Sequence, residues 1–200
     1  MASYNAVTGA LTALESYLDL RLADDPDRDN DISDVLENVD IRLLGSQDLH
    51  GNPNANSVGI YLHRISVDAF GRNRYLQPTR PDQAPRPELP INLHILIIGW
   101  SLGASAEAML VAWAMQQLGS ALELDFSHLG LADPHWGDQD RVQVVPEEMS
   151  TEDLMRVWDS LPGDYRLSSP YIIKTLRLEP ARTITAGPPV DTLVLPMGDH

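Results

Sequence analysis

The sequence predicts an α+β fold in which one mainly antiparallel sheet packs against helices, with long proline-rich arms. The segments follow one another as helix, strand, strand, long loop, strand, helix, short strands, helix and strand, without an internal repeat. Fifteen prolines and thirteen glycines indicate many turns or extended arms. We therefore expect one domain over residues 1–179, with an extended arm at 68–90, followed by a tail at 180–200.

The first 67 residues predict one helix and two strands. Residues 4–22 have apolar side chains at three- and four-residue steps, which is typical of an amphipathic helix. An acidic, solvated loop follows at 24–34, and a strand at 39–44. After a turn at 45–57, residues 58–67 are rich in β-branched and aromatic residues and predict a second strand.

Residues 68–90 combine prolines and arginines in an acidic chain. A stretch this long without secondary structure is uncommon in a compact domain and is usually functional or disordered. One interpretation is a solvated loop. The other is an arm that lies on an acidic neighbour, because guanidinium groups pair bidentately with carboxylates, and residues 24–40 would offer such a target in a ring. The arginines in question are Arg72, Arg74, Arg80 and Arg86.

The middle of the chain predicts the centre of the fold. Residues 91–100 are strongly apolar and indicate a central strand, followed by a helix at 104–118. That helix is apolar nearly all round, so we expect it to be buried on more than one side, one of them against another subunit. Short strands are expected at 122–131 and 141–145.

The C-terminal third begins with a helix at 151–161. Ser150 and Asp153 resemble a capping box at its start, with Asp in place of the usual Glu or Gln. A strand at 172–178 follows. The tail after 179 has several prolines and one apolar island, which we expect to add a strand to a neighbouring sheet edge. The apolar residues of this island are Leu193, Val194 and Leu195.

Composition excludes several classes of function. The net charge of −15 opposes general nucleic-acid binding, because phosphates would be repelled. The absence of cysteine excludes disulfides and cysteine-ligated metals. The uncharged run at 95–106 is far shorter than the roughly 20 apolar residues of a membrane span. We expect no nucleic-acid partner, no membrane insertion and assembly in the cytoplasm.

One motif favours a serine hydrolase, which we keep as the alternative. Gly99-Trp100-Ser101-Leu102-Gly103 fits the G-x-S-x-G pattern of a nucleophile elbow between a strand and a helix. Too few strands precede the motif for an α/β-hydrolase sheet, and no glycine-rich oxyanion loop follows an early strand. A standalone binding module is a third possibility. The elbow's acid and histidine would come from Asp125, Asp133, His128 and His135.

The other chemistry-bearing residues favour structural interpretations. Residues 133–140 gather acids and a histidine, but their spacing matches no calcium loop and indicates a solvated turn. His63 and His94 are expected as half-buried sheet residues, and Trp158 and Tyr165 as core residues. We expect no cofactor, no metal and no catalytic residue.

The chain resembles the cap or tail-terminator family of extracellular contractile injection systems, of the virulence-cassette and antifeeding-prophage type. The resemblance begins with the opening helix and its Arg21-Leu22, and includes the strand at 90–96, similar to the family's Pro-x-x-Leu-x-Leu-x-Val-x-Leu element. The segment 154–174 is its most specific part. Pro162, residues 100–103 and the tail beyond 179 depart from the pattern.

The resemblance implies a structural protein rather than an enzyme. Such proteins form a sixfold ring at the distal end of a phage-tail-like particle and end polymerisation of its sheath and inner tube. The implied partners are further copies of the chain, in a hexamer, together with the sheath and tube proteins. Release of the particle from the cell stays open. The candidate interface residues are Arg72, Arg74, Arg80, Arg86, Leu193, Val194 and Leu195.

Overall fold

A computed structural model describes most of the chain apart from the long loops and the C-terminal tail. The described residues are 4–25, 38–51, 56–69, 75–76, 86–119, 121–125, 127–129, 136 and 141–178, of which 75–76 and 86–87 are described by their backbone alone. The helices are α1 (Ala6–Ala23), the 3-10 helix η1 (Asp48–His50), α2 (Ala104–Leu118) and α4 (Thr151–Asp159). The strands are β1 (Asp40–Leu44), β2 (Ser57–Val67), β3 (Tyr75–Leu76), β4 (Arg86–Pro87), β5 (Leu89–Trp100), β6 (Leu122–Leu124), β7 (Val142–Pro146) and β8 (Ser168–Leu178).

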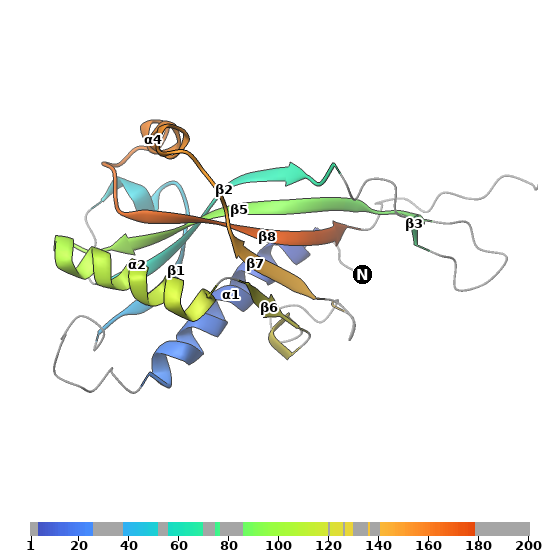
Figure 1. The fold of residues 1–200 in the computed structure, drawn as a ribbon, viewed down its shortest axis with the longest axis horizontal. Coiled ribbons are helices and arrows are strands. Elements are labelled where there is room, and N and C mark those ends of the chain that lie inside the picture. Colours follow the sequence, from blue (N-terminus) through green and yellow to red (C-terminus); the bar gives the residue numbers. More distant parts are fainter. Residues whose placement is uncertain are drawn as a thin grey trace, which may run out of the picture.

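Among the described residues, six strands form the main sheet, in the order β1-β2-β5-β8-β7-β6 (Figure 1). β3 pairs with β4 in a separate two-stranded sheet. The pairing of β1 with β2 is parallel. The other pairings of the sheet are antiparallel. The expectation of a mixed fold with a mainly antiparallel sheet is therefore confirmed.

The central strand β5 separates two apolar cores, because successive side chains of a strand point to opposite faces. Leu93, Ile95 and Ile97 belong to the larger core, which includes residues of α1 and α2. Leu96, Ile98 and Trp100 point the other way and pack with Trp158 of α4. Figure 1 shows the same arrangement, with α4 on one side of the sheet and α1 and α2 on the other.

Helix α2 lies unusually close to β5 at Gly99. A Cβ atom at Gly99 would overlap the backbone carbonyl of Glu107, so only glycine permits this approach. The first glycine of the G-x-S-x-G motif thus has a packing role. The helix has the predicted bounds, but only one of its sides is buried: Ala108, Ala112 and Met115 are exposed on the other.

Two further sequence predictions have different outcomes. Of the capping box predicted for α4, the N-cap bond is confirmed, since the Ser150 hydroxyl accepts a hydrogen bond from the Asp153 amide, while the Asp153 carboxylate accepts from the Ser150 hydroxyl. The strand expected at 122–131 is confirmed over Leu122–Leu124 and is wrong at 127–129. Residues 127–129 are helical, because the Asp125 carboxylate accepts bonds from the Ser127 amide and hydroxyl and so favours a turn.

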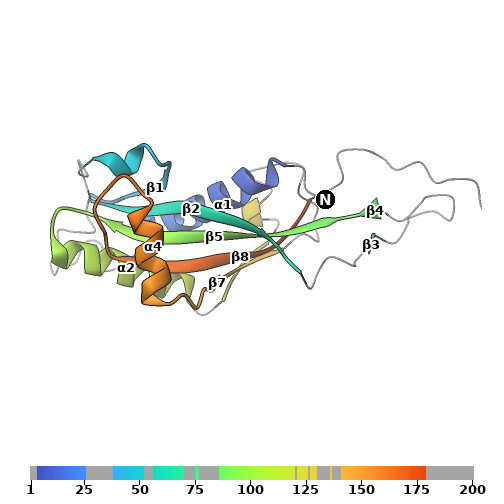
Figure 2. The same cartoon turned by 90° about the horizontal axis from the view of Figure 1, so that it is seen from above.

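The three central strands extend beyond their neighbours. β1 pairs only with residues 57–61 of β2, and β7 only with residues 171–174 of β8. The ribbon of β2, β5 and β8 continues toward β3 and β4 (Figure 2). We call the end of the sheet at Trp100 the blunt end, and the end at Leu89, from which residues 68–88 depart, the arm end.

Candidate functional site

Ser101 is not an exposed nucleophile. Its side chain is buried at 3% exposure, and its hydroxyl donates a 2.7 Å hydrogen bond to Oδ1 of Asn56. Across the described part of the chain, no residue other than glycine has a positive φ, so Ser101 lacks strain of that kind. A nucleophile elbow needs an exposed hydroxyl on a strained turn. The hydrolase alternative therefore finds no support.

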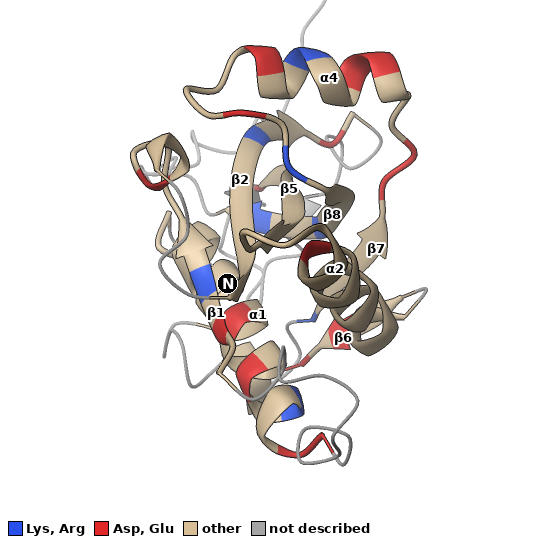
Figure 3. Cartoon of the chain, turned by 90° about the vertical axis from the view of Figure 1, so that its left-hand side faces the viewer, with Lys and Arg blue, Asp and Glu red and all other residues tan. Residues whose placement is uncertain are grey.

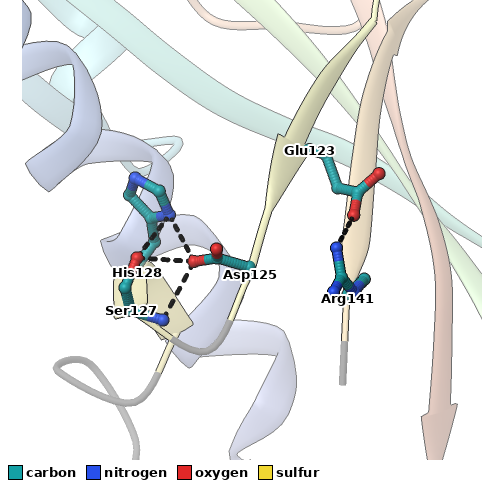
Figure 4. Close-up of polar contacts among 5 residues, drawn as sticks. All are labelled: Glu123, Asp125, Ser127, His128 and Arg141. Carbon is teal, nitrogen blue, oxygen red and sulfur yellow. Dashed lines mark hydrogen bonds and ion pairs between the residues drawn. The ribbon is translucent and has the colours of Figure 1, made fainter. Parts of the chain in front are cut away.

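Two of the residues predicted as the acid and histidine partners of Ser101, Asp125 and His128, instead form a hydrogen-bonded turn (Figure 4). Nδ1 of His128 lies 3.0 Å from Oδ1 of Asp125, which also accepts bonds from the Ser127 amide and hydroxyl. These bonds, above all that from the Ser127 hydroxyl, lower the pKa of Asp125. The His128 ring packs edge-on against Tyr17 of α1, so the group fastens this turn to the helix. Beside it, Arg141 pairs with Glu123 at 2.6 Å and joins β7 to β6.

Arg166 organises the blunt end of the sheet. Its guanidinium lies 4.3 Å from the centre of the Trp100 ring. It also donates to the Ser101 carbonyl at 2.9 Å and to Oε1 of Glu107 at 3.0 Å. The segment between α4 and β8 is thereby fixed against the turn between β5 and α2. Sequence reasoning missed Arg166; the available signal was a charged residue between the apolar Tyr165 and Leu167.

Three large apolar side chains are exposed on these two adjoining segments. Leu102 is 75% exposed, and Tyr165 and Leu167 are exposed as well. The Gly99 amide donates to the Leu167 carbonyl at 3.0 Å, which sets the two segments side by side. We call these three residues the blunt-end patch. The prediction that Tyr165 is a core residue is wrong, although its ring packs edge-on against Trp158, which is buried as predicted.

A second apolar patch lies at the arm end. Ile65 is 51% exposed, and Val67 and Leu89 are exposed too. Ile65 is opposite Leu93 and Val67 opposite Ile91, both buried in the larger core. The core-facing side of the sheet thus continues past the helices that cover it elsewhere. We call Ile65, Val67 and Leu89 the arm-end patch.

A polar cluster occupies the opposite face of the sheet near the arm end. Nδ1 of His94 lies 2.7 Å from Oε1 of Glu147, and Nε2 of His94 lies 2.7 Å from the Ser66 hydroxyl. Arg64 reaches the same Glu147 oxygen at 3.1 Å. His94 is only 5% exposed, so the expectation of a half-buried residue is wrong. The cluster joins β2, β5 and the segment after β7.

The order serine, histidine, carboxylate in this cluster matches that of a catalytic triad. Arg64 distinguishes the cluster from a triad, because its guanidinium lies 3.0 Å from Nδ1 of His94 and donates to the same Glu147 oxygen that His94 contacts. Ser66 is part of a continuous strand paired with Asn92, and is not on an exposed turn. We therefore assign the cluster a structural role: it holds β2, β5 and the segment after β7 together.

His63 stands beside this cluster at an irregularity of β2. The register between β2 and β5 shifts between Leu62 and Arg64, and the His63 ring lies 6.1 Å from that of His94. Burial lowers the pKa of His63, and the charges of His94 and Arg64 lower it further, while Glu147 opposes them. In the folded protein, His63 is therefore biased toward its neutral form.

Most of the predicted interface residues lie outside the described residues. This holds for Arg72, Arg74, Arg80, Leu193, Val194 and Leu195, and of Arg86 only the backbone is described, in β4. Asp133, His135 and the rest of 133–140 also lie outside, apart from Trp136. Across the described ranges, no three histidine or acidic side chains are placed to hold a metal ion. None of the described helices is long and apolar enough to cross a membrane.

Comparison with known proteins gives a matching family model and several similar solved structures, among them a terminator and a cap. The family model of the Pvc16 N-terminal domain matches residues 10–192. The sheath/tube terminator of the PVC extracellular contractile injection system, in its extended state, has a TM-score of 0.58 and 17% identity, over 97% of this chain and 64% of that chain. The tube-terminating cap of the anti-feeding prophage has a TM-score of 0.50 and 16% identity, over 98% of this chain and 62% of that chain.

The chain matches only part of the similar structures and none of the curated proteins. The chain spans less than two thirds of the length of either structure. No curated protein matches the sequence. The resemblance noted from the sequence is nevertheless confirmed, since the family model matches nearly the whole chain.

Proposed function

The chain belongs to the Pvc16 N-terminal domain family, and from this premise we propose that it is a cap, or tail terminator, of a contractile injection system. The observation that carries the proposal is the shared fold over 97% of the chain with a protein described as a sheath/tube terminator. In this role the chain ends polymerisation of sheath and tube at the distal end of the particle. Its partners are further copies in a ring, the last layer of sheath and the last layer of tube.

The described surface supports a role in assembly rather than catalysis. Ser101 is buried, and the carboxylate of the Ser66–His94–Glu147 group is paired with Arg64. The two ends of the sheet, in contrast, carry exposed apolar side chains, and contiguous exposed apolar residues mark interaction sites. We propose that the chain acts without a cofactor and without enzymatic activity.

The predicted arm and tail belong to the same proposal. Arg72, Arg74, Arg80 and Arg86 would pair with acidic groups of a neighbouring subunit. Leu193, Val194 and Leu195 would add a strand to a sheet edge, and the β2 edge beyond Tyr61 has no partner strand among the described residues. Charge reversal at Arg72, Arg74 and Arg80 that leaves assembly intact disproves the role of the arm. Deletion of 180–200 tests the tail in the same way.

The function is tested by assembling sheath and tube proteins with and without the chain. A terminator narrows the distribution of particle lengths, because growth stops wherever a ring binds. We expect long, heterogeneous sheath–tube polymers without the chain and shorter, more uniform ones with it, as measured by negative-stain imaging. A length distribution that does not respond to the chain contradicts the proposed function.

A further inference from the structure

We propose that helix α1 protects the β1 edge of the main sheet, so that no strand of a second copy can add to β1. The protection comes from Glu15 and Asp19, whose carboxylates occupy the backbone amides that β1 turns away from the sheet. We call these two residues the edge-protecting pair. This role does not depend on the proposed function and goes beyond it, because it determines where copies of the chain cannot meet.

Strand β1 lies at an edge of the sheet, since β2 is its only partner strand among the described residues. Successive backbone amides of a strand point to opposite edges. The Asp40 amide donates to the Asn56 carbonyl at 3.2 Å, on the side toward β2. The amides of Ile41 and Leu43 therefore point away from β2. A row of such unpaired groups is a template on which another strand can pair.

The two carboxylates of α1 occupy these outward amides. The Leu43 amide donates to Oε1 of Glu15 at 3.2 Å. The Ile41 backbone forms a hydrogen bond with the Asp19 carboxylate. Four residues of a helix rise about 6 Å and two residues of a strand about 6.6 Å, so carboxylates four residues apart match amides two residues apart. Figure 3 shows α1 beside β1, with acidic residues on the helix in red.

An incoming strand would have to displace both carboxylates. Glu15 and Asp19 are the two acidic residues in the sequence of α1, and both bind the β1 edge. An ionised carboxylate accepts hydrogen bonds and donates none, so it offers nothing to the carbonyl groups of an approaching strand. Its charge also repels another copy of a chain whose net charge is −15. The pair therefore blocks the edge by hydrogen bonding and by charge.

The charge of Asp19 does not contribute to folding stability. Burial raises the pKa of the Asp19 carboxyl; the hydrogen bond from Ile41 lowers it in part, and the neighbouring charge of Asp40 raises it further. An acid whose pKa is raised in the folded state is harder to ionise there than in the unfolded chain, so its charge at neutral pH opposes folding. A group that is kept in place against stability is typical of a residue with another purpose.

The protection ends where β1 ends. β1 pairs with β2 only as far as Tyr61, and α1 has no further acidic residue for the β2 edge at 62–67. Among the described strands, the opposite edge of the sheet is β6, whose three residues make a poor template. The edge-protecting pair thus closes β1 and leaves open the part of β2 that carries the exposed Ile65 and Val67.

The test removes both carboxylates in the double variant Glu15→Ala with Asp19→Ala. In dilute protein, amide hydrogen exchange at Ile41 and Leu43, measured by NMR, should become roughly two- to tenfold faster, as expected for the loss of one net hydrogen bond at each amide. At higher concentration, sedimentation velocity should show more association than in the wild type. Exchange at the same two amides should then slow again, which would locate the new contact at the β1 edge.

Three further variants separate the possible outcomes. Asp19→Ala alone, at an exposed position, should show the faster exchange at Ile41 even if the double variant folds poorly. Glu15→Gln with Asp19→Asn keeps the accepting oxygens and should associate less than the alanine variant. Glu152→Ala with Asp159→Ala removes two exposed carboxylates of α4 and should associate no more than the wild type.

Two results would overturn the proposal. One is an alanine variant that associates no more than the wild type at any concentration. The other is equal association of the α4 variant, because the loss of net charge would then be the cause. Neither result affects the proposed function, which the length distribution of the particles tests separately with the wild-type chain.

Discussion

Arg166 shows how one side chain can determine the form of a whole surface. It contacts the Trp100 ring, the Ser101 carbonyl and the Glu107 carboxylate, which belong to β5, the turn after it and α2. Because neighbouring residues of an extended segment alternate in direction, its inward position turns Tyr165 and Leu167 outward. The blunt-end patch is therefore a consequence of the contacts that Arg166 makes.

Replacing Arg166 should destabilise the protein more than replacing an exposed arginine. Arg166→Ala leaves the largely buried Glu107 carboxylate unpaired, and we expect a loss of about 2 kcal/mol in the free energy of unfolding, below the value for a fully buried pair. Arg156→Ala removes a solvent-exposed pair with Glu152 and should cost about 0.5 kcal/mol or less. Urea denaturation of both variants measures the difference, and equal losses would contradict the role assigned to Arg166.

His63 should make stability depend on pH below neutrality. Its pKa in the folded protein is lowered from 6.5 by burial, with His94 and Arg64 acting in the same direction against Glu147. As the pH falls through 6.5, the unfolded chain takes up a proton that the folded chain resists. The contribution of His63 to the free energy of unfolding is therefore complete above pH 6.5 and is lost as the pH falls toward the lowered pKa.

The corresponding measurement compares His63→Gln with His50→Gln. We expect the fall in the unfolding free energy between pH 7 and pH 5 to be smaller in His63→Gln than in the wild type. His50 is exposed, and its replacement should leave that fall unchanged. If both variants keep the wild-type dependence on pH, another group is responsible for it.

At the scale of elements, the contact between α2 and β5 depends on a single glycine. Gly99→Ala places a methyl group against the Glu107 backbone, so helix and strand must separate. We expect a loss of about 1–3 kcal/mol, typical of overpacking. Gly51→Ala is the matched control, because a Cβ there meets nothing within 4 Å, and we expect a change of about 0.5 kcal/mol or less. Thermal unfolding of both variants checks the prediction.

Local sequence patterns predicted most of the elements but not how they meet. The helix at 104–118 has its predicted bounds, since glycines flank it on both sides. The blunt-end patch could not be predicted, because it depends on the bond between Gly99 and Leu167 from separate segments. The polar cluster likewise depends on the register shift beside His63, for which the sequence offers no turn signal. The proposed arm and tail contacts stay predictions.

At the scale of the whole molecule, acidic and basic residues are unevenly distributed. The sequence predicts residues 24–40 of a neighbouring copy as the target of the arm, and this contact stays a prediction. Asp24→Lys with Asp40→Lys should reduce the number of capped particles, and arginine-to-glutamate changes at Arg74 and Arg80 should restore it in part. The matched control, Asp159→Lys with Asp164→Lys, changes exposed residues of the other acidic region by the same charge and should leave capping unchanged. Counting capped ends in negative-stain images distinguishes the two targets.

Above all, we propose that this chain lies at the distal end of a contractile particle. The most direct measurement is electron microscopy of particles assembled with sheath and tube proteins and with the chain carrying a gold label at an introduced cysteine. We expect label and ring-shaped density at one end of each particle and none along its length. Label spread along the sheath, or absent from particles that nevertheless end uniformly, would contradict it.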